Sequence, residues 1–203
     1  MNDTKEKILL ATLDLSATYG LGAVSMGMIA DKVGIKKPSI YNHFSSKEAL
    51  IEAMYAYLRG EAKKKTSVSA ADYRTLFAEK SAFDILKTAV EEYGKINRDP
   101  HMRAFYKILY SERCRTPSAA KILAEETATM IAATKQLFYA MQVHGLLHFH
   151  DPDMSALSFA MTIHALTDYA EDLHTGNSEC REKTGSMIQD YLLWFCQSNG
   201  AEA

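Results

Sequence analysis

The chain has 203 residues, of which 47% are hydrophobic and 24% charged, a balance typical of a folded globular protein. It has no run of about 18 apolar residues and no N-terminal apolar stretch long enough for a secretory signal, so we expect a cytoplasmic protein. The formal net charge of −2 is unevenly spread, because residues 1–65 contain ten Lys or Arg and seven Asp or Glu, which leaves −5 for the rest. A basic N-terminal part on an acidic body is typical of a DNA-binding head joined to a regulatory domain.

Two helices are predicted at the start of the chain. Asp3 and Glu6 have the spacing of a capping box, which predicts a helix beginning at Asp3 and ending at Gly20. Ile8, Thr12, Leu15 and Tyr19 are predicted to share one face of this helix. Ser25 is a plausible cap for a short second helix over residues 26–33.

A third helix is predicted over residues 37–44, where Pro38 is tolerated because it lies in the first turn. Ser45 and Glu48 form a second capping-box pattern, which predicts a fourth helix continuing to about Lys65.

The remainder of the sequence also has helical periodicity, and we find no convincing alternating strand pattern. Residues 66–72 are small and polar and indicate a break. Asp151 followed by Pro152 is a strong helix start signal. Further helices are predicted at about 74–97, 101–113, 118–146, 153–174 and 183–198. The predicted fold class is therefore all-α.

The segment from Ser25 to Phe44 has the spacing of a helix-turn-helix, with Gly34 at the turn and the small Ala30 where two helices cross. The predicted core of a tri-helical head consists of Ile8, Leu15, Ile29, Val33, Ile35, Ile40 and Phe44. We therefore predict a helix-turn-helix DNA-binding domain over residues 1–48 and a larger helical ligand-binding and dimerisation domain over residues 49–203.

The third helix is predicted to turn a set of polar side chains outward. These are Lys37, Ser39, Tyr41, Asn42 and His43. Lysine suits guanine or phosphate, asparagine suits adenine, and tyrosine and serine suit phosphate oxygens. Lys36 and Lys47 flank the helix where DNA backbone phosphates would run.

The stretch from Lys7 to Met54 resembles the DNA-binding head of the TetR family of repressors. The matching tokens are KILLATLDL, then YG, then the SMxxIADKVGIKKPSIYNHFSSKEAL run. Beyond this stretch the resemblance is only in length and helical character. It implies a homodimer that represses transcription from a near-palindromic operator, and a small molecule that enters the C-terminal domain, shifts the spacing of the two heads and releases the DNA.

Carried over by position, the resemblance implies eight DNA-facing residues. They are Ser25, Lys36, Lys37, Ser39, Tyr41, Asn42, His43 and Lys47. One departure concerns Gly27, which stands where many relatives hold Arg or another polar residue that reaches DNA from the second helix. This chain is therefore expected to depend more heavily on its third helix.

The helices after residue 74 are rich in aromatic residues and methionine, which predicts an apolar pocket for a small apolar or aromatic molecule. The candidate pocket residues are Phe105, Tyr106, Tyr110, Phe138, Met141 and His164. Most aromatic residues of such a domain are simply core, so the pocket remains an open assignment at this stage.

We predict neither a metal nor a cofactor. His144 and His148 are spaced i, i+4 and His150 follows, which suits a metal ion, but a helix end near Gly145, where histidine is favourable against the helix dipole, is the preferred interpretation. His164 and Asp168 have the same spacing, which favours a hydrogen bond. Three cysteines without a C-x-x-C pair make neither a disulfide framework nor a zinc site.

The last two predicted helices, 153–174 and 183–198, are apolar on more than one face, which predicts a homodimer through them. Two other classes of function are open: a dimeric DNA-binding protein controlled by a partner protein, and an enzyme. No nucleophile elbow, Gly-rich phosphate loop or H-E-x-x-H pattern supports the enzyme. The effector, the operator and the choice between repression and activation are not determined by these patterns.

Overall fold

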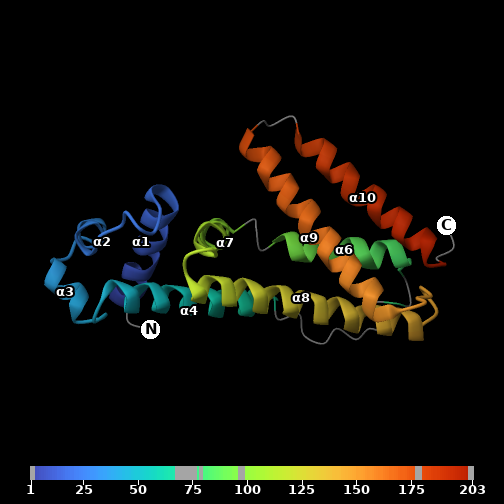
Figure 1. Cartoon of the computed structure of the whole chain (residues 1–203), viewed down its shortest axis with the longest axis horizontal. Helices are drawn as coiled ribbons and strands as arrows, with labels where there is room; N and C mark the ends of the chain where they lie inside the picture. Colours follow the sequence, from blue (N-terminus) through green and yellow to red (C-terminus); the bar gives the residue numbers. More distant parts are fainter. Residues whose placement is uncertain (1–2, 67–76, 78–79, 96–98, 177–179, 201–203) are drawn as a thin grey trace. The chain divides into compact units, whose positions relative to one another are not determined.

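The computed structural model describes residues 3–66, 77, 80–95, 99–176 and 180–200, and every regular element among them is an α-helix (Figure 1). The helices are α1 (Asp3–Tyr19), α2 (Met26–Val33), α3 (Lys37–Tyr41), α4 (Lys47–Thr66), α6 (Ala82–Lys95), α7 (Pro100–Glu112), α8 (Pro117–Val143), α9 (Pro152–Gly176) and α10 (Cys180–Ser198). The predicted all-α fold is confirmed. Within these described ranges, no helix has the length and apolar character needed to cross a membrane.

The chain forms two compact units. The first unit is Met1–Ser67 with Lys95–Ala124, and the second is Val68–Gly94 with Glu125–Ala203. The first unit therefore contains more than the tri-helical head, because α4, α7 and the first turns of α8 share its core. The functional division predicted after residue 48 does not coincide with this packing and remains a prediction.

The core of the first unit contains the residues predicted from the sequence. Ile8, Ile29 and Ile40 are fully buried and Phe44 nearly so, and Leu15, Val33 and Ile35 pack half-buried around them. α1 lies against α2, α4 and α7. Tyr19, the last residue of α1, is 60% exposed. Gly20 ends the helix as predicted, with a φ of +83°.

Two predicted helix starts are shifted. Asp3, the predicted cap of α1, is itself helical, and its carboxylate accepts from Lys7 Nζ at 2.6 Å. Ser46 caps α4 instead of Ser45, since its hydroxyl oxygen accepts from the Ala49 N–H at 3.1 Å. The cap of α4 therefore lies one residue later than predicted, two residues after the buried Phe44.

The start of the helix predicted over 74–97 lies outside the described residues. Phe77 is helical, residues 80 and 81 are not, and α6 begins at Ala82. Ser81 caps α6, because its Oγ accepts from the Asp84 N–H at 3.1 Å and donates to the Asp84 carboxylate at 2.6 Å. Ser-x-x-Asp is a capping signature, and it places the start of α6 more sharply than apolar periodicity does.

The core of the second unit is built from aromatic rings. Phe138 of α8 stacks on Phe149, with centroids 4.6 Å apart and planes 6° apart. Phe159 of α9 and Phe195 of α10 contact the same ring at 5.3 and 5.4 Å. α9 and α10 lie side by side along their length (Figure 1).

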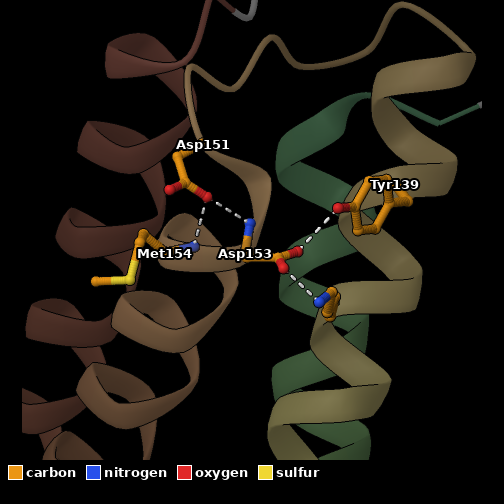
Figure 2. Close-up of polar contacts among 5 residues, drawn as sticks. Tyr139, Asp151, Asp153 and Met154 are labelled. Atoms are coloured by element: carbon orange, nitrogen blue, oxygen red, sulfur yellow. Dashed lines mark hydrogen bonds and ion pairs between the residues drawn. The ribbon is translucent and has the colours of Figure 1, made fainter.

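The corner between α8 and α9 holds a polar contact group at the surface of the second unit (Figure 2). Asp151 caps α9, as predicted, by accepting from the N–H groups of Asp153 and Met154, both at 3.0 Å. The Asp153 carboxylate points toward α8, where it accepts from Tyr139 Oη at 2.9 Å and pairs with Lys135. This group fastens the start of α9 to the last turns of α8.

Candidate nucleic-acid interface

The turn between α2 and α3 has the geometry that a helix-turn-helix requires. Gly34 adopts φ 76° and ψ 31°, the left-handed conformation that glycine accepts without steric cost. The Ile35 N–H bonds to Ala30 O at 3.0 Å and the Gly34 N–H to Asp31 O at 3.2 Å, the pattern of a Schellman motif. α2 therefore stops sharply, and α3 leaves at a defined angle.

α2 is held by one contact at each of its ends. Ser25 caps it, since Ser25 Oγ accepts from the Met28 N–H at 3.2 Å. Lys32, in the last turn, pairs with Asp14 of α1 at 3.3 Å. The Ser25 bond defines where α2 begins, and the ion pair between Lys32 and Asp14 joins the end of α2 to α1.

α3 is shorter than predicted, ending at Tyr41 and not at residue 44. The N–H groups of His43 and Phe44 both bond to Ile40 O at 2.9 Å, so the chain tightens there instead of continuing as an α-helix. Burial of Phe44 in the core requires this turn. Asn42 consequently lies at the C-terminal cap of α3, next to the exposed Tyr41.

The eight predicted DNA-facing residues fall on the start of α2, on α3 and its ends, and on the start of α4. Exposed among them are Ser25, Lys36, Lys37, Tyr41 and Asn42. Half-buried are Ser39, His43 and Lys47. The Lys47 ammonium donates to the Gly22 carbonyl at 3.2 Å, a contact that the sequence pattern did not suggest.

The difference in net charge between the two units is larger than that between residues 1–65 and the rest of the chain. The first unit contains 17 Lys or Arg and 9 Asp or Glu, a formal charge of +8, and the second contains 6 and 16, a formal charge of −10. The extra positive charge of the first unit comes from residues 95–124, which a count over residues 1–65 leaves out. Residues 33–47 contain three lysines and no carboxylate. The unit that contains the helix-turn-helix therefore has the net positive charge that attracts DNA phosphates.

Comparison with known proteins agrees with this geometry. The profile described as bacterial regulatory proteins of the tetR family matches residues 8–54, and that of the C-terminal domain of AefR-like transcriptional repressors matches residues 84–193. The second match alone covers more than half of the chain. The chain belongs to the TetR family. It is thus a DNA-binding transcriptional regulator with a helix-turn-helix.

Solved structures of TetR-like regulators have the same fold over the whole chain. One, from Haloarcula marismortui, is 15% identical with a TM-score of 0.71 and covers 98% of this chain and 99% of its own. Another, from Saccharomonospora viridis, was solved in complex with choline; it is 19% identical with a TM-score of 0.69 and covers 100% of both chains. At these identities the likeness concerns the fold alone.

A curated relative matches in sequence over a short stretch. The Bacillus subtilis protein YerO, described as an uncharacterized HTH-type transcriptional regulator, is 38% identical over 65 residues. The match spans 32% of this chain and 22% of the relative. It therefore supports the DNA-binding class and says nothing about the remaining two thirds of the chain.

The predicted pocket residues of this TetR-family chain do not gather in one compact unit. Phe105, Tyr106 and Tyr110 lie in the first unit, where Phe105 is 1% exposed against Tyr55, while Phe138, Met141 and His164 lie in the second. Phe138 and Met141 are fully buried in its core. His164 is half-buried, with its Nδ1 2.9 Å from Tyr93 Oη of α6 and its Nε2 3.7 Å from Asp168. The predicted hydrogen bond between His164 and Asp168 is not formed at this distance, although the two side chains are neighbours. The hydrogen-bond partner of the His164 ring is Tyr93, which the sequence did not signal.

His144 and His148 do not lie on one helix in the structure. α8 ends at Val143 and not at residue 146, because Gly145 adopts φ 72° and the Leu146 N–H bonds back to Met141 O at 2.9 Å. His144 and His148 are therefore not one turn apart on a helix face, and the His144 ring packs edge-on against Phe77 at 5.1 Å. In the part of the chain that the structure describes, no three His, Cys, Asp or Glu residues come together in a way that suits a metal ion.

Proposed function

We propose that this TetR-family regulator is a cytoplasmic homodimeric repressor that binds a near-palindromic operator through α3 and is released from it by a small apolar or aromatic molecule. The single observation that supports operator binding most strongly is the chemistry around α3. Exposed Lys36, Lys37, Tyr41 and Asn42 surround a short helix that leaves a Schellman turn, with no carboxylate from residue 33 to residue 47.

In this proposal the exposed side chains divide into two roles. Lys36, Lys37 and Tyr41 bind phosphates and set the position of the head, while Asn42 contacts a base edge in the major groove. Ser25, Ser39, His43 and Lys47 lie at the margins of the same contact. Ser25 and Lys47 also have structural bonds, so replacing either one changes more than a DNA contact.

The homodimer is proposed to form through α9 and α10. On these two helices the exposed apolar side chains are Met154, Leu157, Met161, Tyr169, Met187, Leu193 and Trp194. Met154, Leu157 and Met161 are spaced by three and four residues, so they share one face of α9. An apolar stripe of this kind supports packing against a second copy of the chain.

The effector is proposed to bind in the helical domain that follows α4. The aromatic content of the second unit supports an apolar or aromatic molecule, with His164 and Tyr93 as a polar contact. A relative of equal length was solved with choline, which makes choline one probe worth including. Control by a partner protein is the alternative, and the effector experiment separates the two.

Operator binding is tested by selecting the genomic DNA fragments that the full-length protein retains and measuring fluorescence anisotropy on the best one. We expect specific binding that Lys37→Ala weakens more than Lys107→Ala, which removes an exposed lysine of the same unit from α7. Equal losses for the two variants, or no preference for any fragment over random DNA, would contradict the proposal.

The effector is tested by thermal shift against a panel of apolar and aromatic compounds, with choline included. A compound that raises the melting temperature should also release the operator, and operator DNA should weaken its binding by the same factor. Release that requires zinc would contradict the organic effector. A panel without any shift, together with capture of one defined protein on the operator-bound dimer, would support the partner-protein alternative.

A further inference from the structure

Lys47 makes a contact that encloses the whole helix-turn-helix. It is the first residue of α4, and its Nζ donates to the backbone carbonyl of Gly22 at 3.2 Å, 25 residues earlier in the sequence. Gly22 lies in the connection between α1 and α2, and α2 and α3 lie between the two bonded residues. The bond therefore joins the entrance of the motif to its exit.

The connection that Lys47 holds is already partly ordered. Leu21 and Val24 are buried on either side of its exposed tip. The Ala23 N–H bonds to Gly20 O at 3.2 Å, which closes a tight turn. Ser25, directly after this turn, is the residue that caps α2. A bond at Gly22 therefore acts on the segment that sets the start of α2.

A lysine at this position has a cost. A positive charge in the first turn of a helix opposes the helix dipole, and a half-buried lysine gives up side-chain freedom. Lys36 and Lys37 avoid the second cost, since both are exposed. The bond to Gly22 fixes the position of the Lys47 side chain, which attraction to phosphates would not require.

We propose that Lys47 is a positioning residue for DNA recognition, which closes the segment from Gly22 to the start of α4 and so holds α2 and α3 in the arrangement that fits the operator. This inference rests on the proposed operator binding. The ammonium has three N–H donors, so the bond to Gly22 leaves its charge available to a phosphate. Positioning through the Gly22 bond exists without DNA and depends little on salt, whereas a phosphate contact exists only with DNA and weakens as salt rises.

The experiment compares three variants of the full-length protein. Lys47→Met removes both the charge and the donor, and Lys47→Arg keeps both. Lys36→Met is the charge-matched control, since it removes an exposed lysine outside the Gly22 contact. Hydrogen exchange of the peptide covering residues 20–26 is measured without DNA, and operator affinity is measured over a range of salt concentrations.

Without DNA, Lys47→Met should speed exchange in residues 20–26, where the Ala23 amide reports on the turn, and Lys36→Met and Lys47→Arg should match the wild type. Operator affinity is extrapolated to 1 M salt, where counterion release contributes little. There Lys47→Met should bind the operator about two- to ten-fold more weakly than wild type. Lys47→Arg should keep most of the wild-type operator affinity under the same conditions.

Two results would overturn the inference. One is unchanged exchange in residues 20–26 of Lys47→Met. The other is faster exchange with full operator affinity at 1 M salt and only a shallower salt dependence, which would make Lys47 a phosphate contact and nothing more. Neither result affects the proposed operator binding, which fails separately if the wild-type protein prefers no genomic fragment over random DNA.

Discussion

Two residues at the end of α3, Tyr41 and Asn42, are proposed to have different roles in DNA recognition. Asn42 lies at the C-terminal cap of the helix and is exposed. If its amide contacts an adenine edge, Asn42→Ala should lose discrimination at one base pair by roughly 1–3 kcal/mol. The measurement is anisotropy on the selected operator and on a set of single base-pair substitutions of it.

Tyr41→Phe is the comparison for Asn42→Ala. Tyr41 is 46% exposed, and a phosphate contact through its hydroxyl would weaken binding to specific and random DNA alike. The two assignments would be reversed if Tyr41→Phe changed the preferred base pair. Equal loss on all sequences for Asn42→Ala would remove Asn42 from base recognition.

Gly27 offers a gain of affinity at the second residue of α2. A Cβ built there meets only Ser25 Oγ at 3.7 Å, which is ordinary contact, so the backbone leaves room for a Cβ. Gly27→Arg should bind DNA more tightly and steepen the salt dependence by about 0.9 in log–log slope if it gains one phosphate. Gly27→Ala is the control, since it raises helix stability by up to about 1 kcal/mol without adding charge. Weaker binding by Gly27→Arg would show that α2 does not face the DNA backbone.

Two tyrosines of α4 show how differently one helix uses the same side chain. Tyr57 Oη donates to the Glu6 carboxylate of α1 at 2.8 Å, whereas the Tyr55 hydroxyl is buried without a partner. Burial raises the pKa of both phenols to about 12, helped by Glu6 at Tyr57 and by the charge of Glu112 at Tyr55. The first bond fastens α4 to α1, and the second hydroxyl adds no such bond.

Tyr57→Phe should therefore lower the free energy of unfolding by about 1 kcal/mol, since it breaks a hydrogen bond to a charged group that is only partly buried. Tyr55→Phe should leave stability unchanged or raise it, because it removes a buried hydroxyl that bonds to nothing in the described structure. Urea unfolding of both variants and the wild type is the measurement. A greater loss in Tyr55→Phe than in Tyr57→Phe would mean that the Tyr55 hydroxyl has a partner, such as a buried water.

The corner between α8 and α9 gives the second unit a pH-dependent contact (Figure 2). Bonds from Lys135 and Tyr139 hold the pKa of Asp153 below its usual value, and the same bonds raise the pKa of Lys135 and of Tyr139. A carboxyl group with a depressed folded-state pKa stabilises the fold above its unfolded-state pKa of about 4, and this contribution is lost as the pH falls through the folded-state value.

Asp153→Asn should accordingly lower the melting temperature at pH 7, and its difference from wild type should narrow as the pH falls below about 4. Asp190→Asn is the control, since Asp190 is an exposed carboxylate on α10 of the same unit. A deficit in Asp153→Asn that stays constant between pH 7 and pH 3 would point to lost packing and not to the ion pair.

At the scale of the whole molecule, the exposed apolar face of α9 and α10 predicts the oligomeric state. Trp194 is 59% exposed, while the neighbouring Leu192 is 1% exposed inside its own unit, so of these two residues only Trp194 can contact a second copy. Sedimentation velocity at micromolar concentration should give twice the 22.7 kDa chain mass for wild type. Trp194→Glu should shift this toward the monomer, and Gln136→Glu, an exposed change on α8, should not. A wild-type species at the monomer mass would contradict the dimer.

Most of the head was predictable because its determinants are local. Ser25 caps α2, Gly34 ends it, and Ile29 and Ile40 face inward at helical spacing, all within twenty residues. The polar residues around α3 follow from the same periodicity. Errors arose where a buried residue overrode local preference: Phe44 turns into the core, so α3 stops at Tyr41 and Ser46 replaces Ser45 as the next cap.

By itself the sequence determined an all-helical chain with a helix-turn-helix near its start and the residues that surround α3, because caps, turns and periodicity act over a few neighbours. Only the tertiary structure decided which segments share a unit. Residues 95–124 join the basic first unit, and the Lys47 ammonium bonds to Gly22 across 25 residues. Contacts of this kind depend on how helices pack, and no spacing pattern along the chain encodes that packing.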